Sequence, residues 1–157
     1  MTKNQAKILL LQRVKYDPTS PSGLTDLNGS PVGTLNHDGY WLIASKRWLF
    51  TVHILIWEMH RGPVPKGHEI DHQTGKHNDI NNLRIATRAQ NMANVGIIGS
   101  NTSGVKGMSY SKSGNDWRGQ VTHQGVHHRF RHKDPAVVEQ WLIDTRNKHH
   151  GAFAHHK

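Results

Sequence analysis

The sequence lacks cysteine altogether, and it contains only 11 acidic residues among 157. Without cysteine the chain can form neither disulfide bonds nor zinc sites built from thiolates, and an intracellular location is allowed. Long apolar runs are also missing, because the run at residues 7–11 is too short for the core of a signal peptide or for a membrane span. We therefore expect no targeting segment and no membrane partner.

Positive charge, by contrast, is abundant. The 20 Lys and Arg residues give a formal net charge of +9 with histidine counted as neutral, and the 14 His residues add charge at mildly acidic pH. Residues 101–157 carry more than half of the net charge and more than half of the histidines. Such a composition favours a polyanionic partner such as a nucleic acid. A merely soluble basic protein is the alternative.

Residues 68–94 show the order strand, loop, strand, helix. Apolar and polar residues alternate at 69–72 and again at 83–87, which predicts two strands, and the Gly, Asn and Asp residues between them are typical of a loop. Thr87 then begins a capping box, which predicts a helix over residues 89–95. This order brings polar side chains to the ends of neighbouring elements.

Four of these polar side chains suit the hydrolysis of a phosphodiester bond. Asp71 and His72 end the first predicted strand, Asn82 stands at the loop exit, and Asn91 lies about one turn into the helix. The reaction needs a base and a cation. An imidazole is a suitable base near pH 7, and carboxylate and amide oxygens suit Mg²⁺ or Mn²⁺. Neighbouring strand residues point to opposite faces, so Asp71 and His72 can share a site only if the strand ends and bends there.

These residues resemble the HNH endonucleases with a ββα-metal motif, in the branch found in phage homing endonucleases. The resemblance implies cleavage of duplex DNA with one Mg²⁺ or Mn²⁺ per active site, held by Asp71 and Asn91, and it implies His72 as general base. It also implies that Asn82 braces the loop and orients the base, in a monomer or homodimer in the cytoplasm of a bacterial host. The matching motifs are Ile70-Asp71-His72, Asn78-Asp79, Asn82-Leu83-Arg84, residues 86–91 and Asn94.

Other interpretations remain open. Each of these polar residues alone could be an ordinary turn or cap residue. The same fold could also serve a sequence-specific DNA-binding protein without activity, or a nuclease directed at RNA. Metal-dependent nicking of plasmid distinguishes the nuclease from an inactive DNA-binding protein. Competition between duplex DNA and RNA distinguishes it from a nuclease directed at RNA.

The residues before this stretch predict a supporting sheet and helix. Turn signals and short apolar pairs before residue 36 favour a small N-terminal sheet, and residues 39–43 and 47–52 predict a hairpin. A helix over 53–60 should follow and stop at Gly62. His53 could face DNA or support the site from behind the residues that act directly, but a histidine packed under the hairpin is the preferred interpretation. We expect the tryptophans to lie in the core: Trp41, Trp48 and Trp57.

Residues 105–157 predict a second domain after a Gly- and Ser-rich linker at 96–104. Residues 105–111, 117–122 and 126–131 predict three strands, and Asp134 should cap a covering helix. Together with the motifs at 101–107 and 150–154, this pattern resembles the DNA-binding domain of plant ethylene-response factors. The segment at 130–133 departs from that pattern.

Alternation along these strands predicts which face reads DNA. Trp117, Gly119 and Val121 should face the helix, so the polar residues lie on the opposite face. That face can bind base edges or phosphates; the alternative is that it is merely solvated. The predicted DNA-binding residues are Lys106, Arg118, Gln120, Thr122, His127, Arg129 and Arg131. The sequence thus predicts an α+β protein with a nuclease domain at 1–95, whose catalytic unit is 68–95, and a three-stranded antiparallel sheet packed on one helix.

Overall fold

The computed structural model describes residues 1–97, 99–154 and 156, and within them the fold is mixed α+β, with small antiparallel sheets and four α-helices. The predicted fold class is confirmed. Ile98, in the expected linker, and His155 and Lys157, at the end of the expected second domain, lie outside the described residues. None of the described helices is long and apolar enough to cross a membrane.

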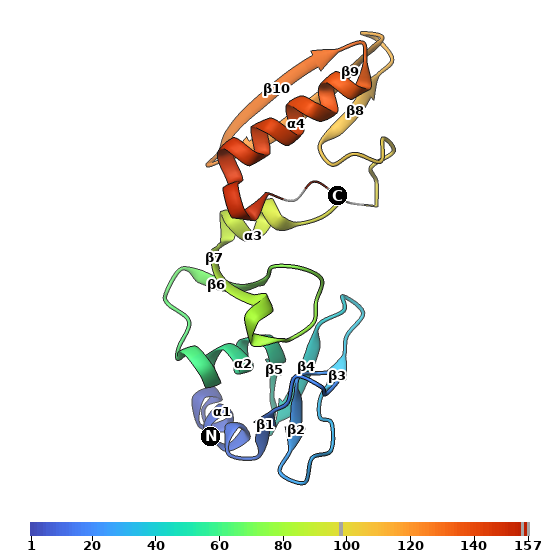
Figure 1. The fold of residues 1–157 in the computed structure, drawn as a ribbon. Helices are drawn as coiled ribbons and strands as arrows, with labels where there is room; N and C mark the ends of the chain where they lie inside the picture. Colours follow the sequence, from blue (N-terminus) through green and yellow to red (C-terminus); the bar gives the residue numbers. More distant parts are fainter. Residues whose placement is uncertain (98, 155, 157) are drawn as a thin grey trace. The chain divides into compact units, whose positions relative to one another are not determined.

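The chain separates into two compact units, Met1–Ala86 and Thr87–Lys157, and each is described by itself (Figure 1). The predicted catalytic helix at 89–95 therefore falls in the second unit rather than the first. The division into a nuclease domain at 1–95 and a DNA-binding domain at 105–157 stays a prediction.

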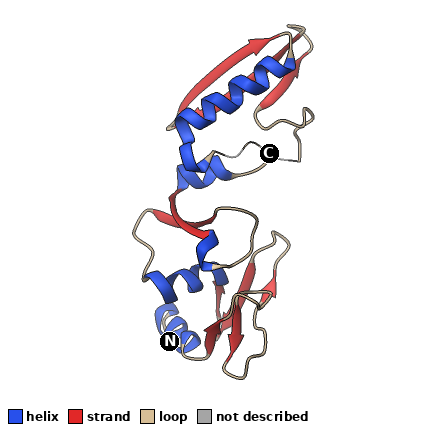
Figure 2. Cartoon of the chain, in the orientation of Figure 1, coloured by secondary structure: helices blue, strands red, loops and turns tan. Residues whose placement is uncertain are grey.

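The first unit contains two α-helices, a 3₁₀ helix and three small sheets, with orders β1-β2, β3-β4-β5 and β6-β7 (Figure 2). A helix at residues 3–11 precedes the small sheet that was predicted for the N-terminal region. Its elements are α1 (Lys3–Leu11), β1 (Val14–Tyr16), β2 (Leu24–Asp26), β3 (Thr34–Leu35), β4 (Trp41–Ser45), β5 (Trp48–Thr51), α2 (Val52–Arg61), β6 (His68–His72), η1 (Ile80–Asn82) and β7 (Leu83–Thr87).

Local chemistry explains these boundaries. Thr2 and Gln5 form a capping box that starts α1, and Gly62, with φ of 81°, ends α2. The predicted hairpin is formed by β4 and β5, which pair Ser45 with Trp48 around Lys46 in the left-handed region. The predicted strands 69–72 and 83–87 are β6 and β7.

One hydrophobic core holds the first unit together, and it draws on almost its whole length. The three tryptophans expected in the core are partly buried and pack against it. Because the core joins residues before 25 to β6 and β7, the N-terminal segment supports the strands that carry the candidate site. Its buried members are Ala6, Leu10, Val14, Leu24, Ile43, Phe50, Val52, Leu55, Ile56, Ile70 and Leu83.

The second unit contains a three-stranded antiparallel sheet of order β10-β9-β8, with α4 covering one face (Figures 1 and 2). Gly119 on the central strand permits this packing, because a Cβ atom there would lie about 3 Å from Val138, Trp141 and Leu142. The elements are α3 (Arg88–Asn94), β8 (Met108–Ser111), β9 (Asp116–His123), β10 (Val126–His132), α4 (Pro135–His150) and η2 (Gly151–Phe153).

Two boundaries of this unit follow from side-chain hydrogen bonds. Asp134 accepts a hydrogen bond from the amide of Ala136, so α4 begins where the sequence predicted. By contrast, β8 begins at Met108, three residues later than expected. Asn101 and Ser103 both donate to the carbonyl of Val105, which keeps this residue in a turn rather than in the sheet.

Candidate functional site

Asp71 and His72 occupy the C-terminal end of β6, and both are buried, with exposed fractions of 6% and 7%. The strand ends at His72, and the amide of Gln73 donates to the carbonyl of Asn82, the residue just before β7. The chain bends at Gln73 and Thr74, directly after the pair, as a shared site requires.

Arg84 on β7 holds the carboxylate of Asp71. Its Nε and Nη2 atoms both lie 2.9 Å from Oδ2 of Asp71, in a largely buried ion pair. A buried carboxylate needs such compensation, because its desolvation is costly. The sequence placed Arg84 within the recognised motif but assigned it no role; its position on the neighbouring strand is what brings it to Asp71.

The imidazole of His72 is held by an amide. Its Nε2 atom lies 2.9 Å from Oδ1 of Asn78, and Nδ2 of Asn78 donates to the backbone carbonyl of Ser22 at 2.8 Å. Burial lowers the pKa of His72 below its ordinary value, more than the Asn78 hydrogen bond and the charge of Asp71 raise it. A neutral imidazole at pH 7 is the form that accepts a proton.

His53 forms one wall of this site. Its ring meets that of His72 edge to face, with centroids 4.7 Å apart, and Tyr40 lies 5.6 Å from His53. Burial, helped by the charge of His72, lowers the pKa of His53 to about 3. His53 is thus packed, as preferred from the sequence, and its contact with His72 also places it beside the candidate base.

Asn82 braces the loop that follows His72. Its Oδ1 accepts hydrogen bonds from the amide and hydroxyl of Thr74, and its Nδ2 donates to the carbonyls of Thr74 and His77. The amide that contacts the imidazole, however, belongs to Asn78. The expected orientation of the base by Asn82 is therefore revised: the two asparagines divide the expected roles, one for the loop and one for the base.

The donor set at Asp71 fits a hard divalent cation. Within the described parts of the chain, no three His, Cys, Asp or Glu side chains gather in a way that could hold a metal ion. One carboxylate with few further protein ligands is how Mg²⁺ is usually bound, since it retains water and takes substrate phosphate oxygens. Asn91 lies on α3 in the second unit, so its place among the ligands rests on the resemblance alone.

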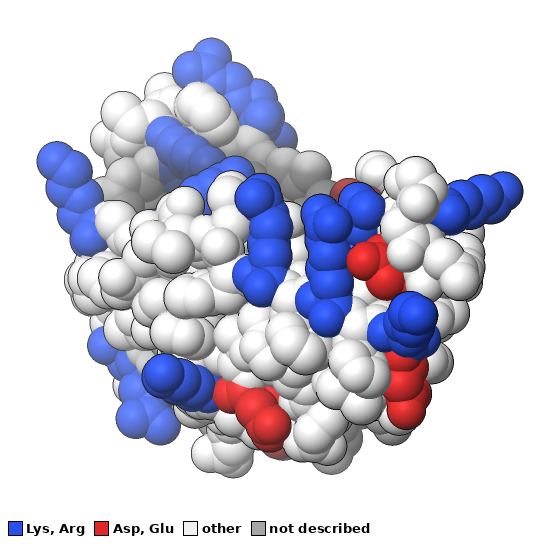
Figure 3. All heavy atoms as spheres, turned by 90° about the horizontal axis from the view of Figure 1, so that it is seen from above, with Lys and Arg blue, Asp and Glu red and all other residues white. Residues whose placement is uncertain are grey.

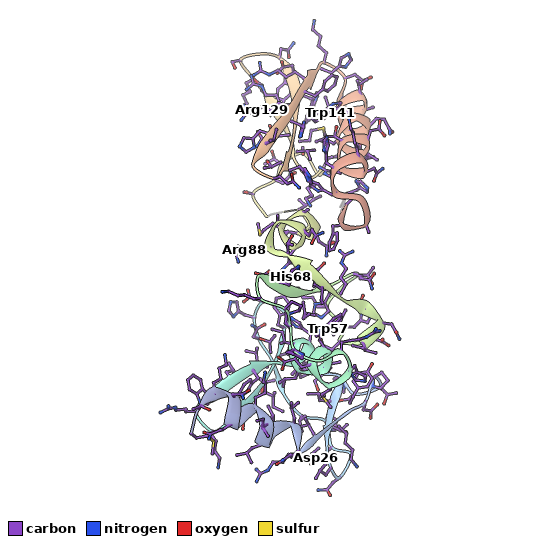
Figure 4. The ribbon with its side chains drawn as sticks, turned by 90° about the vertical axis from the view of Figure 1, so that its left-hand side faces the viewer. Asp26, Trp57, His68, Arg88, Arg129 and Trp141 are labelled. Carbon is purple, nitrogen blue, oxygen red and sulfur yellow. The ribbon has the colours of Figure 1, made fainter. Side chains whose placement is uncertain are left out.

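The predicted face of the second unit is formed as the alternation indicated. Strands β9 and β10 pair His127 with Thr122, Arg129 with Gln120 and Arg131 with Arg118. Arg129 lies on the face away from the helix, whereas Trp141 lies between α4 and the sheet, where it stacks on Phe130 (Figure 4). Two of the three pairs are hydrogen-bonded, through Arg129 with Gln120 and Thr122 with His127.

Lys106 differs from the other residues predicted to bind DNA. It is partly buried, and its ammonium donates to the carbonyl of Ala93 in the last turn of α3. Burial, with a smaller effect of Arg146, lowers the pKa of Lys106 to about 8. On the face seen in Figure 3, Lys and Arg side chains cover more of the surface than Asp and Glu side chains do.

Comparisons with known proteins agree with this geometry. The family model described as HNH endonuclease matches residues 50–93, which contain the Asp71 and His72 pair, Asn78, Asn82 and Arg84. Protein 3.8 of Escherichia phage T7 is 45% identical over 104 residues, which cover 65% of this chain and 86% of that protein. No solved structure matches the chain. The chain therefore belongs to the same family as Protein 3.8 of phage T7, and it carries an HNH endonuclease domain at residues 50–93.

Proposed function

We propose that the chain is a metal-dependent endonuclease of the homing type that hydrolyses phosphodiester bonds in duplex DNA. The observation that carries this proposal is the buried pair at the end of β6, in which a carboxylate and an imidazole adjoin within an HNH domain. The carboxylate can bind a cation, and the imidazole can act as the base.

In the proposed reaction, His72 removes a proton from a water molecule, which attacks the phosphorus atom. The bond from phosphorus to the 3′ oxygen breaks, which leaves a 5′-phosphate and a 3′-hydroxyl. Arg84 keeps Asp71 in place, and Asn82 keeps the loop closed beside the base. A single Mg²⁺ or Mn²⁺, bound by Asp71 and, from the resemblance, by Asn91, would supply positive charge for the phosphate and the departing oxygen.

Nicking of supercoiled plasmid tests this function. With Mg²⁺ the protein should convert supercoiled plasmid to open circles, a chelator should abolish the conversion, and His72→Ala should slow it by about 10² to 10⁴. His68→Ala is the matched control, because His68 lies on the same strand but is exposed. Equal rates for His72→Ala and the parent protein would exclude the proposed base.

We further propose that the second unit, as a domain like that of ethylene-response factors, places its sheet in the major groove. The supporting feature is the polar face formed by three cross-strand pairs, two of which contain arginine, which can contact phosphates or base edges. By the same reasoning Lys106, which is turned toward α3, contributes less than Arg118, Arg129 and Arg131.

A further inference from the structure

The base of the candidate site is held from outside the matched HNH region. Asn78 contacts both His72 and Ser22, and Ser22 precedes the start of the match at residue 50. All three residues are buried, with exposed fractions of 7% for His72, 6% for Asn78 and 0% for Ser22. Water therefore cannot easily replace either hydrogen bond, and the three groups must satisfy one another.

We propose that Asn78 is a positioning residue that determines which nitrogen of His72 carries the hydrogen, and that the Ser22 carbonyl orients Asn78 for this task. The inference rests on the proposed function, since it concerns the same imidazole. It adds to that function a hydrogen bond between two parts of the chain 56 residues apart, which orients the base.

The orientation of Asn78 follows from what its neighbours can accept. A backbone carbonyl only accepts hydrogen bonds, so the side of the amide that faces Ser22 must be the NH₂ group. The oxygen of Asn78 then faces His72 at 2.9 Å. With the amide flipped, two oxygen atoms would meet across 2.8 Å in a buried place without a hydrogen between them.

The tautomer of His72 follows in turn. An amide oxygen only accepts, so Nε2 of His72 must carry the hydrogen. In the neutral ring the lone pair then lies on Nδ1, and Nδ1 is the atom that takes the proton from water. The hydrogen bonds from Ser22 through Asn78 thus favour the tautomer that presents the lone pair at Nδ1.

The Ser22 carbonyl is itself fixed by a buried turn. The hydroxyl of Ser22 donates to the carbonyl of Leu24 and accepts from the amide of Leu24. The hydroxyl of Ser20 also donates to the Leu24 carbonyl. Gly23 has φ of 82°, and a Cβ atom there would lie 2.8 Å from Cδ1 of Ile56 and 3.1 Å from both Cβ and O of Asn78. The turn thus fits closely against Asn78 and requires glycine at this position.

A second hydrogen bond joins the same two segments. The hydroxyl of Tyr16 accepts from the amide of Ile80, two residues after Asn78. Residues 16–24 therefore hold the catalytic loop at two points, one at the base and one at the start of η1.

Nitrogen NMR of the His72 ring tests the proposal on the full chain without metal. At about pH 8, above the ordinary pKa of histidine, the expected spectrum has a protonated, pyrrole-type Nε2 and an unprotonated, pyridine-type Nδ1. Asn78→Ala should shift both signals toward the average of the two tautomers and slow plasmid nicking by about 10- to 100-fold, as for other groups that orient a reactive residue.

A pair of glycine variants tests whether the fit of the turn against Asn78 and Ile56 matters beyond backbone strain. Gly23→Ala should displace Asn78 and reproduce both effects. Gly29→Ala, with φ of 90° and no atom within 4 Å of the added Cβ, brings similar backbone strain without that contact and should leave the tautomer and nicking unchanged.

The outcomes distinguish this inference from the function itself. A parent protein with its hydrogen on Nδ1, or an Asn78→Ala variant with unchanged ring signals, would overturn the proposed positioning role, whether or not DNA is cut. Expected ring signals in a parent protein that never nicks DNA would support the positioning role and overturn the proposed nuclease activity alone.

Discussion

At the scale of single residues, the surroundings of His72 keep its ring neutral and fixed. His53 packs against one edge, Asn78 holds Nε2, and both histidines have pKa values below their ordinary range because they are buried. The same burial that suits a base makes the first unit sensitive to acid.

His53 should make this unit less stable as pH falls. Its pKa is about 3 in the folded chain against 6.5 in the unfolded chain, so the unfolded state alone binds the proton between these values. Stability should therefore fall by about 1.4 kcal/mol per pH unit below pH 6.5. In urea unfolding, the parent protein should lose about 2 kcal/mol more than His53→Gln between pH 7 and pH 5. A parallel loss in both proteins would refute the assignment.

Arg84 should matter for stability as well as for the site. Arg84→Met removes the cation that lies 2.9 Å from the buried Asp71 carboxylate and should lower the free energy of unfolding by about 3 kcal/mol. Arg84→Lys keeps the charge and should cost clearly less. Chemical denaturation measures both, and equal stability of the parent and Arg84→Met would show that the ion pair contributes nothing.

Sequence reasoning identified Asp71, His72 and Asn82 because they stand at fixed places in a local pattern of strand, loop, strand and helix. It assigned Asn78 no contact, because the partner Ser22 is distant in sequence and its carbonyl carries no signal in the sequence. Arg84 was visible as part of a motif, but only the pairing of β6 with β7 shows what it contacts.

At the scale of elements, strands β9 and β10 place Arg118 directly opposite Arg131 on one face. Like charges in such a pair destabilise a sheet. Asp116 lies 3.4 Å from the Arg118 guanidinium and compensates in part. This arrangement is consistent with a face that receives phosphate groups.

Substitution of one of these arginines should change the stability of the sheet and its affinity for DNA in opposite directions. Arg131→Thr should raise the free energy of unfolding by about 0.5 kcal/mol, through loss of the repulsion, and lower affinity for duplex DNA. The slope of log affinity against log salt should fall by about one. Lys133→Thr removes the same charge just after β10 and should leave stability unchanged. Unaltered affinity and slope in Arg131→Thr would argue against this face as the DNA contact.

Helices and strands could be predicted where a clear alternation of apolar and polar residues or a helix-capping residue marked them. Alternation gave the faces of β9 and β10, and Asp134 gave the start of α4. The start of β8 was missed because a side-chain network around Asn101 and Ser103 competes with strand pairing. The unit boundary at Ala86 was also not visible, since the loop composition pointed to residues 96–104.

At the scale of the whole molecule, the HNH match covers only part of the unit that supports it. Ala6, Leu10 and Leu24 share one core with Ile70 and Leu83. A fragment of residues 50–95 should therefore be largely unfolded by circular dichroism, whereas residues 1–95 should unfold cooperatively. A cooperatively folded 50–95 fragment would show that the N-terminal segment is dispensable for the fold.

The boundary between the two units, at Ala86 and Thr87, also affects how genes of this kind can recombine. A crossover there transfers the imidazole together with the turn that orients it. A crossover near residue 50 would instead combine the turn of one parent with the catalytic loop of another, and the imidazole would stay oriented only where that turn still fits against Asn78.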